Sequence, residues 1–331
     1  MTVCGFTMVG LATFARVAMA YVRASKRVRL LRACIRGVLD LLLARRAERV
    51  AVMQIGAHLA WMNYNDPFGS VVRHTLNRRN ATAFLAVVVE PQPHVFQRLR
   101  QSSKQFAASG VVRFENVAVC ASGAASVDFF LVDPSVDMVS GRDNRTGIRA
   151  PRWTSQIASL DRSQVVRKMP RVLRNAANYS EDTYIKRVRV PCASIAELVA
   201  RHGIASESFG LLSIDTEGHD VKILQASPLD EFRPWILNWE KKFATADEIC
   251  ALLDRLRRLG YSCECGPENM WCYHRRVREA QVAACLEVPP SYEFTCLGRG
   301  SACSARYAPR FGNESPHLCP TCGKGKRNWG H

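Results

Sequence analysis

The sequence predicts an α/β fold with a mainly parallel sheet, one antiparallel strand and helices on both faces. Short, almost wholly apolar runs such as 83–89 and 211–214 are typical of parallel strands that are buried on both faces. These runs alternate with helical segments, which is the pattern of a parallel sheet built from strand–helix–strand units. Two last apolar segments, 261–265 and 270–273, have the spacing of a hairpin. The hairpin predicts the antiparallel strand.

The individual elements follow from local patterns. An Asn-Asp-Pro sequence at 65–67 is a typical helix start, because Pro fits the first helical position. The segment 111–119 is expected to pair with 126–131. Strands are predicted at 49–55, 83–89, 111–119, 126–131, 187–192, 211–214 and 234–239, and helices at 67–76, 92–100, 195–201, 221–224 and 247–259.

Acidic residues follow three of the predicted strands directly. Glu90, Asp215 and Glu240 stand where apolar runs end, and open parallel sheets bind ligands at the carboxyl ends of their strands. An acid after the second strand of such a sheet commonly holds the ribose of a nucleotide. Gly56 precedes Glu90 by more residues than in the dinucleotide fingerprint, and no further glycine follows it closely. This spacing argues against NAD as the ligand.

Positive charge is concentrated outside the predicted sheet. The net charge is +17, and residues 1–50, 141–189 and 275–331 hold the excess of Lys and Arg. The segment 133–186 shows no sustained period, and a stretch of this length is usually functional or disordered. Its arginines suit an anionic substrate or nucleic acid, but they show no regular interleaving with aromatic residues for base stacking, which disfavours nucleic acid. The alternative is a solvated, partly helical cover over the sheet edge.

The N-terminal 48 residues form a basic extension with three interpretations. Residues 1–22 are apolar apart from one arginine, and no acid occurs before Asp40. The segment is therefore an organelle transit peptide, a membrane signal anchor, or a basic amphipathic helix packed beside the first strand. The first two would place the protein in an organelle or on a membrane, and otherwise it is expected in the cytoplasm.

The last part of the chain, residues 276–331, is a cysteine-rich basic tail. Cys319 and Cys322 have the two-residue spacing of a zinc knuckle, and Cys296 and Cys303 are the best candidates for a second pair of ligands. A structural zinc ion is one interpretation of this tail. Disulfides or an unstructured tail are the alternatives.

Six short motifs, taken in order, resemble the FkbM family of S-adenosylmethionine-dependent methyltransferases. The resemblance covers about residues 49–275, which defines the expected methyltransferase domain. It implies a class I methyltransferase (Rossmann-like) fold with a seven-stranded sheet. The motifs are QIGA at 54–57, NDP at 65–67, EPQP at 90–93, FENVA at 114–118, VRVPC at 188–192 and IDTEGHD at 214–220.

The resemblance also implies a cofactor site for S-adenosylmethionine. Gln54, Gly56, Ala57 and His58 would form the turn beside the methionine part, and Glu90 would hold the ribose hydroxyls. The remaining cofactor-binding residues would be Asn116 and Val117 near the adenine, with Asp215 beside the methyl group.

Similarity to this family implies transfer of a methyl group to an oxygen of a sugar or another small molecule. Asp215, Glu217 and His219 would be the catalytic residues, and Asp66 and Glu240 would lie on the acceptor side. A carboxylate or histidine is suited to accept the proton of an attacking hydroxyl. Acids at this position also complement the dipole of the helix that follows, without any catalysis.

The chain departs from the family pattern directly after the glycine turn. Related sequences usually carry Asn, Asp and Gly where this chain has His58, Leu59 and Ala60. The glycine that related sequences carry is therefore replaced by Ala60, at a place where the backbone would approach the cofactor. The alternative function is therefore a catalytically degenerate protein with the same fold that binds an anionic partner.

Overall fold

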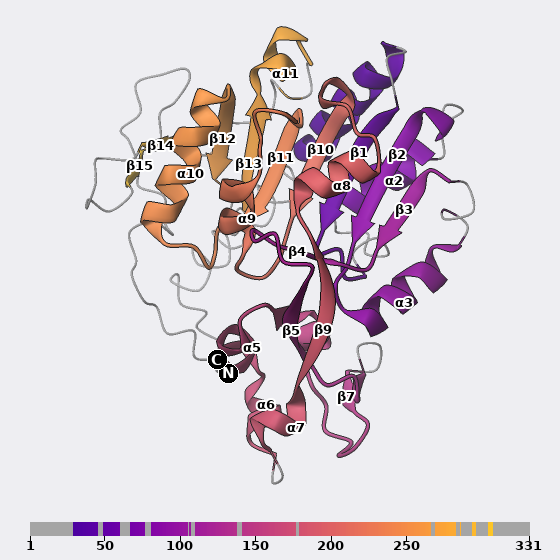
Figure 1. Cartoon of the computed structure of the whole chain (residues 1–331), viewed down its shortest axis with the longest axis vertical. Helices are drawn as coiled ribbons and strands as arrows, with labels where there is room; N and C mark the ends of the chain where they lie inside the picture. Colours follow the sequence, from indigo (N-terminus) through magenta and orange to yellow (C-terminus); the bar gives the residue numbers. More distant parts are fainter. Residues whose placement is uncertain are drawn as a thin grey trace, which may run out of the picture.

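A seven-stranded sheet forms the body of the molecule (Figure 1). The computed structural model describes residues 29–45, 49–59, 67–76, 81–104, 106, 110–137, 141–176, 179–265, 269–282, 285, 293–295 and 304–306. The strand order is β12-β13-β11-β10-β1-β2-β3. These strands are β1 (Val50–Ile55), β2 (Phe84–Val89), β3 (Val112–Glu115), β10 (Phe209–Ile214), β11 (Ile236–Glu240), β12 (Tyr261–Cys265) and β13 (Asn269–His274).

Strand β13 is antiparallel to both of its neighbours, and the other neighbouring pairs in this sheet are parallel. This confirms the mainly parallel sheet with one antiparallel strand. The chain builds outward from β1 to β3 and then returns to β10 on the other side of β1. Ligands of open α/β sheets bind at such a switch point, outside the carboxyl ends of the strands. The ends of β1 and β10 are therefore the first place to look for a site.

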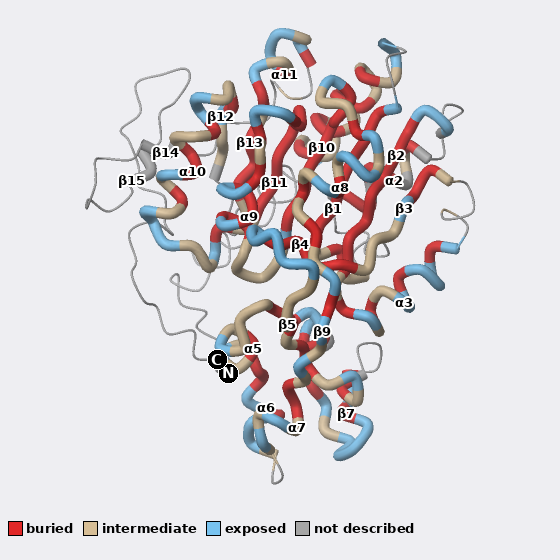
Figure 2. Tube along the Cα trace, viewed as in Figure 1, coloured by how far each residue is buried: buried red, intermediate tan, exposed pale blue. Residues whose placement is uncertain are grey.

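Helices cover both faces of the sheet, as predicted. Alternate residues of β1 divide between two hydrophobic clusters, with Ala51 and Met53 in one and Val50 and Val52 in the other. The first cluster is covered by α8 (Ile195–Arg201), α9 (Asp220–Ala226) and α10 (Ala246–Arg258). The second is covered by a helix of residues 29–44, α2 (Pro67–Leu76), α3 (Pro93–Ser102) and α11 (Arg275–Glu279). The central strands β1, β2, β10 and β11 are almost entirely buried between the two layers, and the edge strands β3 and β12 are more exposed (Figure 2).

The helix of residues 29–44 is part of the core. Its apolar side chains Leu31, Ile35, Leu39 and Leu42 are buried against the sheet, and a disulfide joins Cys34 to Cys285. This packing matches the amphipathic-helix interpretation for the described residues of the extension. No helix in the described part of the chain is long and apolar enough to cross a membrane. Residues 1–28, which include the apolar segment 1–22, lie outside the described residues.

The arginine-rich segment 133–186 belongs to a second, smaller lobe below the sheet in Figure 1. A four-stranded sheet of order β4-β9-β5-β8 supports it, and Val165, Met169, Leu173 and Tyr184 share a small core of their own. The elements are β4 (Ala118–Val119), β5 (Ser126–Val132), β6 (Val136–Asp137), β7 (Arg142–Asp143), η3 (Arg152–Gln156), β8 (Ala158–Ser159), α5 (Arg162–Lys168), α6 (Arg171–Arg174), α7 (Glu181–Tyr184) and β9 (Ile185–Ala193).

The expected pairing of 111–119 with 126–131 is wrong. The predicted strand divides into β3, which joins the large sheet, and β4, which pairs with β9. Strand β5 pairs along its whole length with β9 instead. The two strands lie far apart in sequence, so local patterns could not reveal their pairing.

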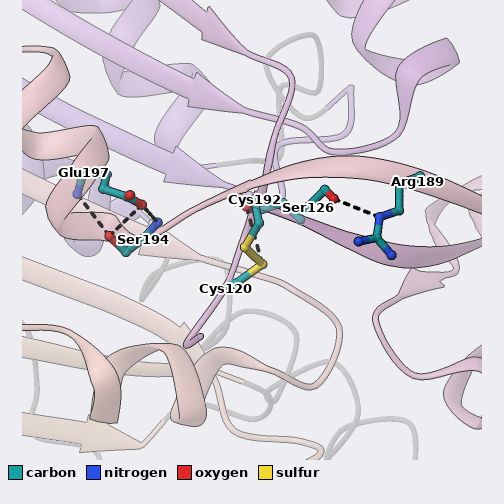
Figure 3. The surroundings of a disulfide bond; sticks show 7 residues. Cys120, Ser126, Arg189, Cys192, Ser194 and Glu197 are labelled. Carbon is teal, nitrogen blue, oxygen red and sulfur yellow. Dashed lines mark hydrogen bonds between the residues drawn. A yellow bond between two sulfur atoms is a disulfide. The ribbon is translucent and has the colours of Figure 1, made fainter. Parts of the chain in front are cut away.

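The lobe is attached to the sheet body at the β4–β9 junction (Figure 3). Cys120, directly after β4, forms a disulfide with Cys192 of β9. Just beyond it, Ser194 and Glu197 form a capping box that starts α8. The covalent link and the helix start therefore hold the base of the lobe against the large sheet.

Another disulfide joins Cys263 and Cys272, which are register partners in the β12–β13 hairpin. Cys272 is also fully buried in the core. The remaining described elements are η2 (Ala81–Ala83), η4 (Ser206–Ser208), β14 (Glu293–Thr295) and β15 (Ser304–Arg306).

Candidate functional site

A cavity of about 460 Å³ lies at the carboxyl ends of the central strands. The second lobe closes part of it with Phe129, Trp153 and Leu160. The cavity brings together nine of the residues that the sequence predicted for the site. They are Gln54, Gly56, Ala57, His58, Glu90, Val117, Asp215, Glu217 and His219.

Gly56 makes the tight turn after β1 with a φ of +75°. A Cβ at this position would lie 1.8 Å from the backbone oxygen of Asp215. The Gly56 and Ala57 N–H groups both donate to the Val89 oxygen at 3.0 Å. The close approach that requires glycine is therefore made by the chain's own backbone, and it brings the ends of β1, β2 and β10 together.

Glu90 is 2% exposed and holds two loops at once. Its Oε2 accepts the His58 N–H at 2.6 Å, and its Oε1 accepts the Gln92 N–H at 2.9 Å. Burial raises the pKa of Glu90 to about 7, against the opposing effect of these hydrogen bonds. Each carboxylate oxygen has a second lone pair. Either oxygen can therefore still accept a hydrogen bond from a ligand hydroxyl.

His58 occupies the left-handed region, with a φ of +45°. Histidine, like Asn and Asp, is enriched there among residues other than glycine, so His58 is compatible with this backbone conformation. Its Nε2 lies 3.3 Å from the Ser155 hydroxyl in η3. Burial, and then the nearby His94, lowers the pKa of His58 to about 4. The ring is therefore neutral at physiological pH.

Ser155 closes a ring of hydrogen bonds around the Glu90 end of the cavity. Its backbone oxygen accepts the Gln92 side-chain amide at 3.5 Å, while its hydroxyl meets His58. Together with the two bonds to Glu90, these contacts connect β1, β2 and the second lobe. Residue types alone did not indicate Ser155, because its role depends on the position of the lobe.

Asn116 lies behind the cavity wall. Its side-chain amide donates to the backbone oxygens of Glu90 and Pro91, at 2.8 and 3.2 Å. These bonds use the two hydrogens of the carboxamide and fix the chain after β2. The next residue, Val117, lines the cavity.

The other end of the cavity is formed by the loop after β10. Asp215 is exposed to the cavity, and its N–H donates to the Ile55 oxygen at 3.0 Å. Glu217 has a φ of +56° and forms an ion pair with Lys168 of α5. The Lys168 ammonium also lies 3.7 Å from the centre of the Phe243 ring. The second lobe is thus bound to this end of the cavity as well.

Two neighbouring carboxyl groups are buried behind the loop. Asp220 is 2% exposed and accepts bonds from Thr216 and from the Glu240 N–H, so it joins the ends of β10 and β11. Burial, followed by the charges of Asp215, Glu217 and Asp220, raises the pKa of Glu240 to about 9. Glu240 does not line the cavity, and its carboxyl is protonated at neutral pH.

His219 lines the cavity and precedes the first turn of α9. Burial lowers its pKa, as does the charge of Lys222, while Asp161 acts in the opposite direction. The Nδ1 atom is buried and has no hydrogen-bond partner among the described residues. His219 is therefore a neutral imidazole able to accept a proton.

Some predicted ligands cannot be placed. Asp66 and the four tail cysteines proposed for zinc (Cys296, Cys303, Cys319 and Cys322) lie outside the described residues. Within the described ranges, no group of His, Cys, Asp or Glu is arranged to hold a metal ion. The proposal of a structural zinc ion therefore has no support from the structure.

Comparison with known proteins identifies the family. The family model for the methyltransferase FkbM domain matches residues 54–266, which is more than half of the chain. A comparison with curated proteins gives no match. Among solved structures, the chain is similar to precorrin-6y C5,15-methyltransferase from Geobacter metallireducens GS-15, with 10% identity, coverage of 73% of this chain and 86% of that chain, and a TM-score of 0.30. The extent of the family match shows that this chain is a Rossmann-like methyltransferase of the FkbM family.

Proposed function

We propose that the protein transfers a methyl group from S-adenosylmethionine to a hydroxyl oxygen of a sugar or another small molecule. The observation that carries this proposal is the convergence of the Gly56 turn, Glu90 and the loop with Asp215 on one cavity. Its volume is within the usual range for small-ligand pockets. The strand order and the single antiparallel strand suit the class I methyltransferase fold.

The residues at the Glu90 end fit the cofactor. Glu90 keeps acceptor capacity for the two ribose hydroxyls after its bonds to His58 and Gln92. Val117 supplies an apolar surface for the adenine next to this carboxylate. Although His58 departs from the family pattern, its N–H donates to Glu90, so this turn still orients the carboxylate. These contacts support an enzyme over the non-catalytic alternative.

The opposite end suits the proton transfer that methylation of a hydroxyl requires. Bound S-adenosylmethionine would supply an electrophilic methyl group on a positively charged sulfur. Asp215 presents a carboxylate to the cavity, and neutral His219 can accept the proton of the attacking hydroxyl. Because Glu217 is paired with Lys168, its role is to hold the second lobe in place. Positioning of the hydroxyl by these groups lowers the barrier further.

Measurement of S-adenosylhomocysteine formation with a panel of sugars and small alcohols tests the proposal. We expect Asp215→Asn to lower kcat by about 100-fold, because a positioned carboxylate contributes about 10²–10⁴-fold in such reactions. Affinity for S-adenosylhomocysteine should change much less. Unchanged turnover in this variant would contradict the role of Asp215. Turnover that is absent from the wild type for every acceptor, together with absent cofactor binding, would support the non-catalytic alternative.

A further inference from the structure

A row of polar side chains crosses the sheet beneath the cavity. Gln54 of β1 is the register partner of Ser213 in β10, and Ser213 is the partner of Asn238 in β11. Asn238 is in turn opposite Trp271 of β13. Register partners on neighbouring strands point to the same face of a sheet. These side chains therefore form one continuous line.

The row interrupts an otherwise apolar face. Two residues before Ser213 and Asn238, on the same face, Leu211 and Ile236 are buried in the cluster under α2. Ser213 is 8% exposed and Asn238 is 7% exposed. A buried polar group costs about 1–3 kcal/mol unless it is hydrogen-bonded. Packing alone would favour apolar residues here, so the polar pair needs another explanation.

The pair satisfies only part of its own hydrogen-bonding capacity. The Asn238 side-chain amide donates to the Ser213 hydroxyl oxygen at 3.1 Å. The Asn238 Oδ1 is buried, and no described residue forms a hydrogen bond with it. Because the Ser213 oxygen accepts a bond, its own hydrogen remains available to donate. Ser213 and Asn238 thus offer one donor and one acceptor side by side.

Both residues line the cavity, next to apolar aromatic side chains. Phe68 of α2 and Trp271 line it as well, and both belong to the apolar cluster on this face. A hydroxyl can donate and accept at the same time, whereas a carboxylate only accepts and an ammonium only donates. The combination of a donor, an acceptor and aromatic surface suits a ring that carries several hydroxyl groups.

The charges around the cavity act against anionic ligands. Among the described residues that line it there is no Lys or Arg, whereas Asp215 and Glu217 are acidic. The pKa values of His58 and His219 are lowered, mainly by burial, so both rings are neutral at physiological pH. A phosphate or carboxylate on the ligand would therefore find no cationic side chain in the described lining, and the nearby Lys168 is already paired with Glu217. Asp215 would repel such a group.

We propose that Ser213 and Asn238 form a subsite that binds a second hydroxyl of a neutral, polyhydroxylated acceptor, while another hydroxyl of the same molecule faces Asp215. This inference rests on the proposed methyl transfer and adds the residues that select the acceptor. Ser213 donates to the second hydroxyl, and Asn238 accepts from it. A site built to bind a hydroxyl strongly disfavours an analogue that lacks it, since its own buried groups then stay unpaired.

The experiment uses the full chain, tritiated S-adenosylmethionine and matched sets of acceptors. Neutral methyl glycosides are compared with the corresponding uronates and sugar phosphates, and the best acceptor is then tested as its single-deoxy analogues. We expect transfer to a neutral glycoside and not to its anionic counterparts. We further expect that loss of one hydroxyl, other than the methylated one, lowers kcat/KM at least tenfold.

Two variants connect this preference to the subsite. In Asn238→Leu and in Ser213→Ala, the fall in kcat/KM caused by the deoxy analogue should be less than about threefold. The variant has already lost the hydrogen bond that the missing hydroxyl would make. The control is Ser208→Ala, which removes a buried serine outside the cavity and should keep the full penalty. Ser213→Ala removes a single oxygen, so it serves as the test if Asn238→Leu does not fold.

The outcomes separate this inference from the proposed function. Retained binding of S-adenosylhomocysteine with transfer only to anionic acceptors, or to none of the glycosides, would overturn the subsite while the cofactor site remains. An unchanged deoxy penalty in both variants would also overturn it. Absence of cofactor binding in the wild type would instead overturn the proposed function itself.

Discussion

The two ends of the cavity use their acidic residues in opposite ways. At the first end, Glu90 accepts two backbone N–H bonds, from His58 and Gln92, and the Gln92 side chain joins the same loop to Ser155 of the second lobe. At the second end, Asp215 is exposed, and its charge helps to raise the pKa of Glu240 to about 9. The first end is organised before any ligand binds. The second end of the cavity carries negative charge, and a positively charged ligand bound there would be attracted to it.

This difference indicates a division of labour. A preorganised hydrogen-bonding site suits the recognition of a neutral group such as ribose, because little order has to be gained on binding. Excess negative charge suits a sulfonium and an acceptor that loses a proton. Gly56 and Asp215 meet through backbone atoms, so the two ends share one rigid contact.

The largest effect is expected from Gly56→Ala, which should disrupt both ends at once. The added Cβ would overlap the Asp215 backbone oxygen at 1.8 Å, and we expect a loss of about 4 kcal/mol or more in unfolding free energy. Gly147→Ala is the control. Gly147 also has a positive φ, but a Cβ added there would meet no atom of the described residues within 4 Å. It should cost only about 1–2 kcal/mol. Similar urea-unfolding curves for the two variants would contradict this account of the turn.

The next effect concerns the Glu90 end alone. Glu90→Gln should weaken S-adenosylhomocysteine binding by about 10–100-fold, since charge-assisted hydrogen bonds contribute about 1.5–3 kcal/mol. In the wild type, affinity should increase between pH 6 and 8 as the carboxyl with a pKa of about 7 ionises. The variant should lose this dependence. Calorimetric titrations at three pH values measure both quantities, and parallel pH profiles would contradict the role of Glu90.

A smaller effect is expected where the second lobe meets the Asp215 end. Lys168→Met removes the ion pair with Glu217 and the contact with Phe243. We expect kcat/KM to fall by about three- to tenfold, because a partly exposed pair contributes modestly. The neighbouring Arg167 is exposed, and Arg167→Met should have no effect on rate. Equal kcat/KM values for the two variants would show that catalysis does not depend on this contact of the second lobe.

A last effect concerns the pH dependence of stability and not the rate of catalysis. The pKa of Glu240 is raised in the folded protein. The contribution of Glu240 to the free energy of unfolding is therefore complete below the ordinary pKa of 4.5 and is lost as pH rises toward 9. Glu240→Gln should therefore be more stable than the wild type at pH 9, by about 1–3 kcal/mol, and equal at pH 4. Urea unfolding at the two pH values measures this difference. If the variant is no more stable than the wild type at pH 9, Glu240 ionises in the folded protein without loss of stability.

The large sheet and most of the cavity could be predicted because their signals are local. Apolar runs that end in Glu90 or Asp215 identify buried strands and their tips, and the hairpin at 261–273 identifies the antiparallel strand. The parallel arrangement then places the strand tips at one edge. The strand pattern and the resemblance to the FkbM family together gathered residues from four distant segments into one cavity.

The second lobe and its contacts could not be predicted in the same way. The β5–β9 pairing and the Ser155–His58 contact join residues that are distant in sequence. Their residue types carry no distinctive pattern. The roles of Lys168 and Ser155 depend on where the lobe folds back, which is a tertiary property. The backbone at His58 also needed the structure, because the sequence does not reveal that its φ is +45°.

The most direct test of the account is calorimetric titration of the wild-type protein and of Glu90→Gln with S-adenosylhomocysteine at pH 8. The account predicts saturable binding of one molecule per chain to the wild type. It also predicts a clear loss of affinity in the variant. No detectable binding to the wild type at millimolar ligand, or equal affinity of the two proteins, would contradict the assignment of this cavity as the cofactor site.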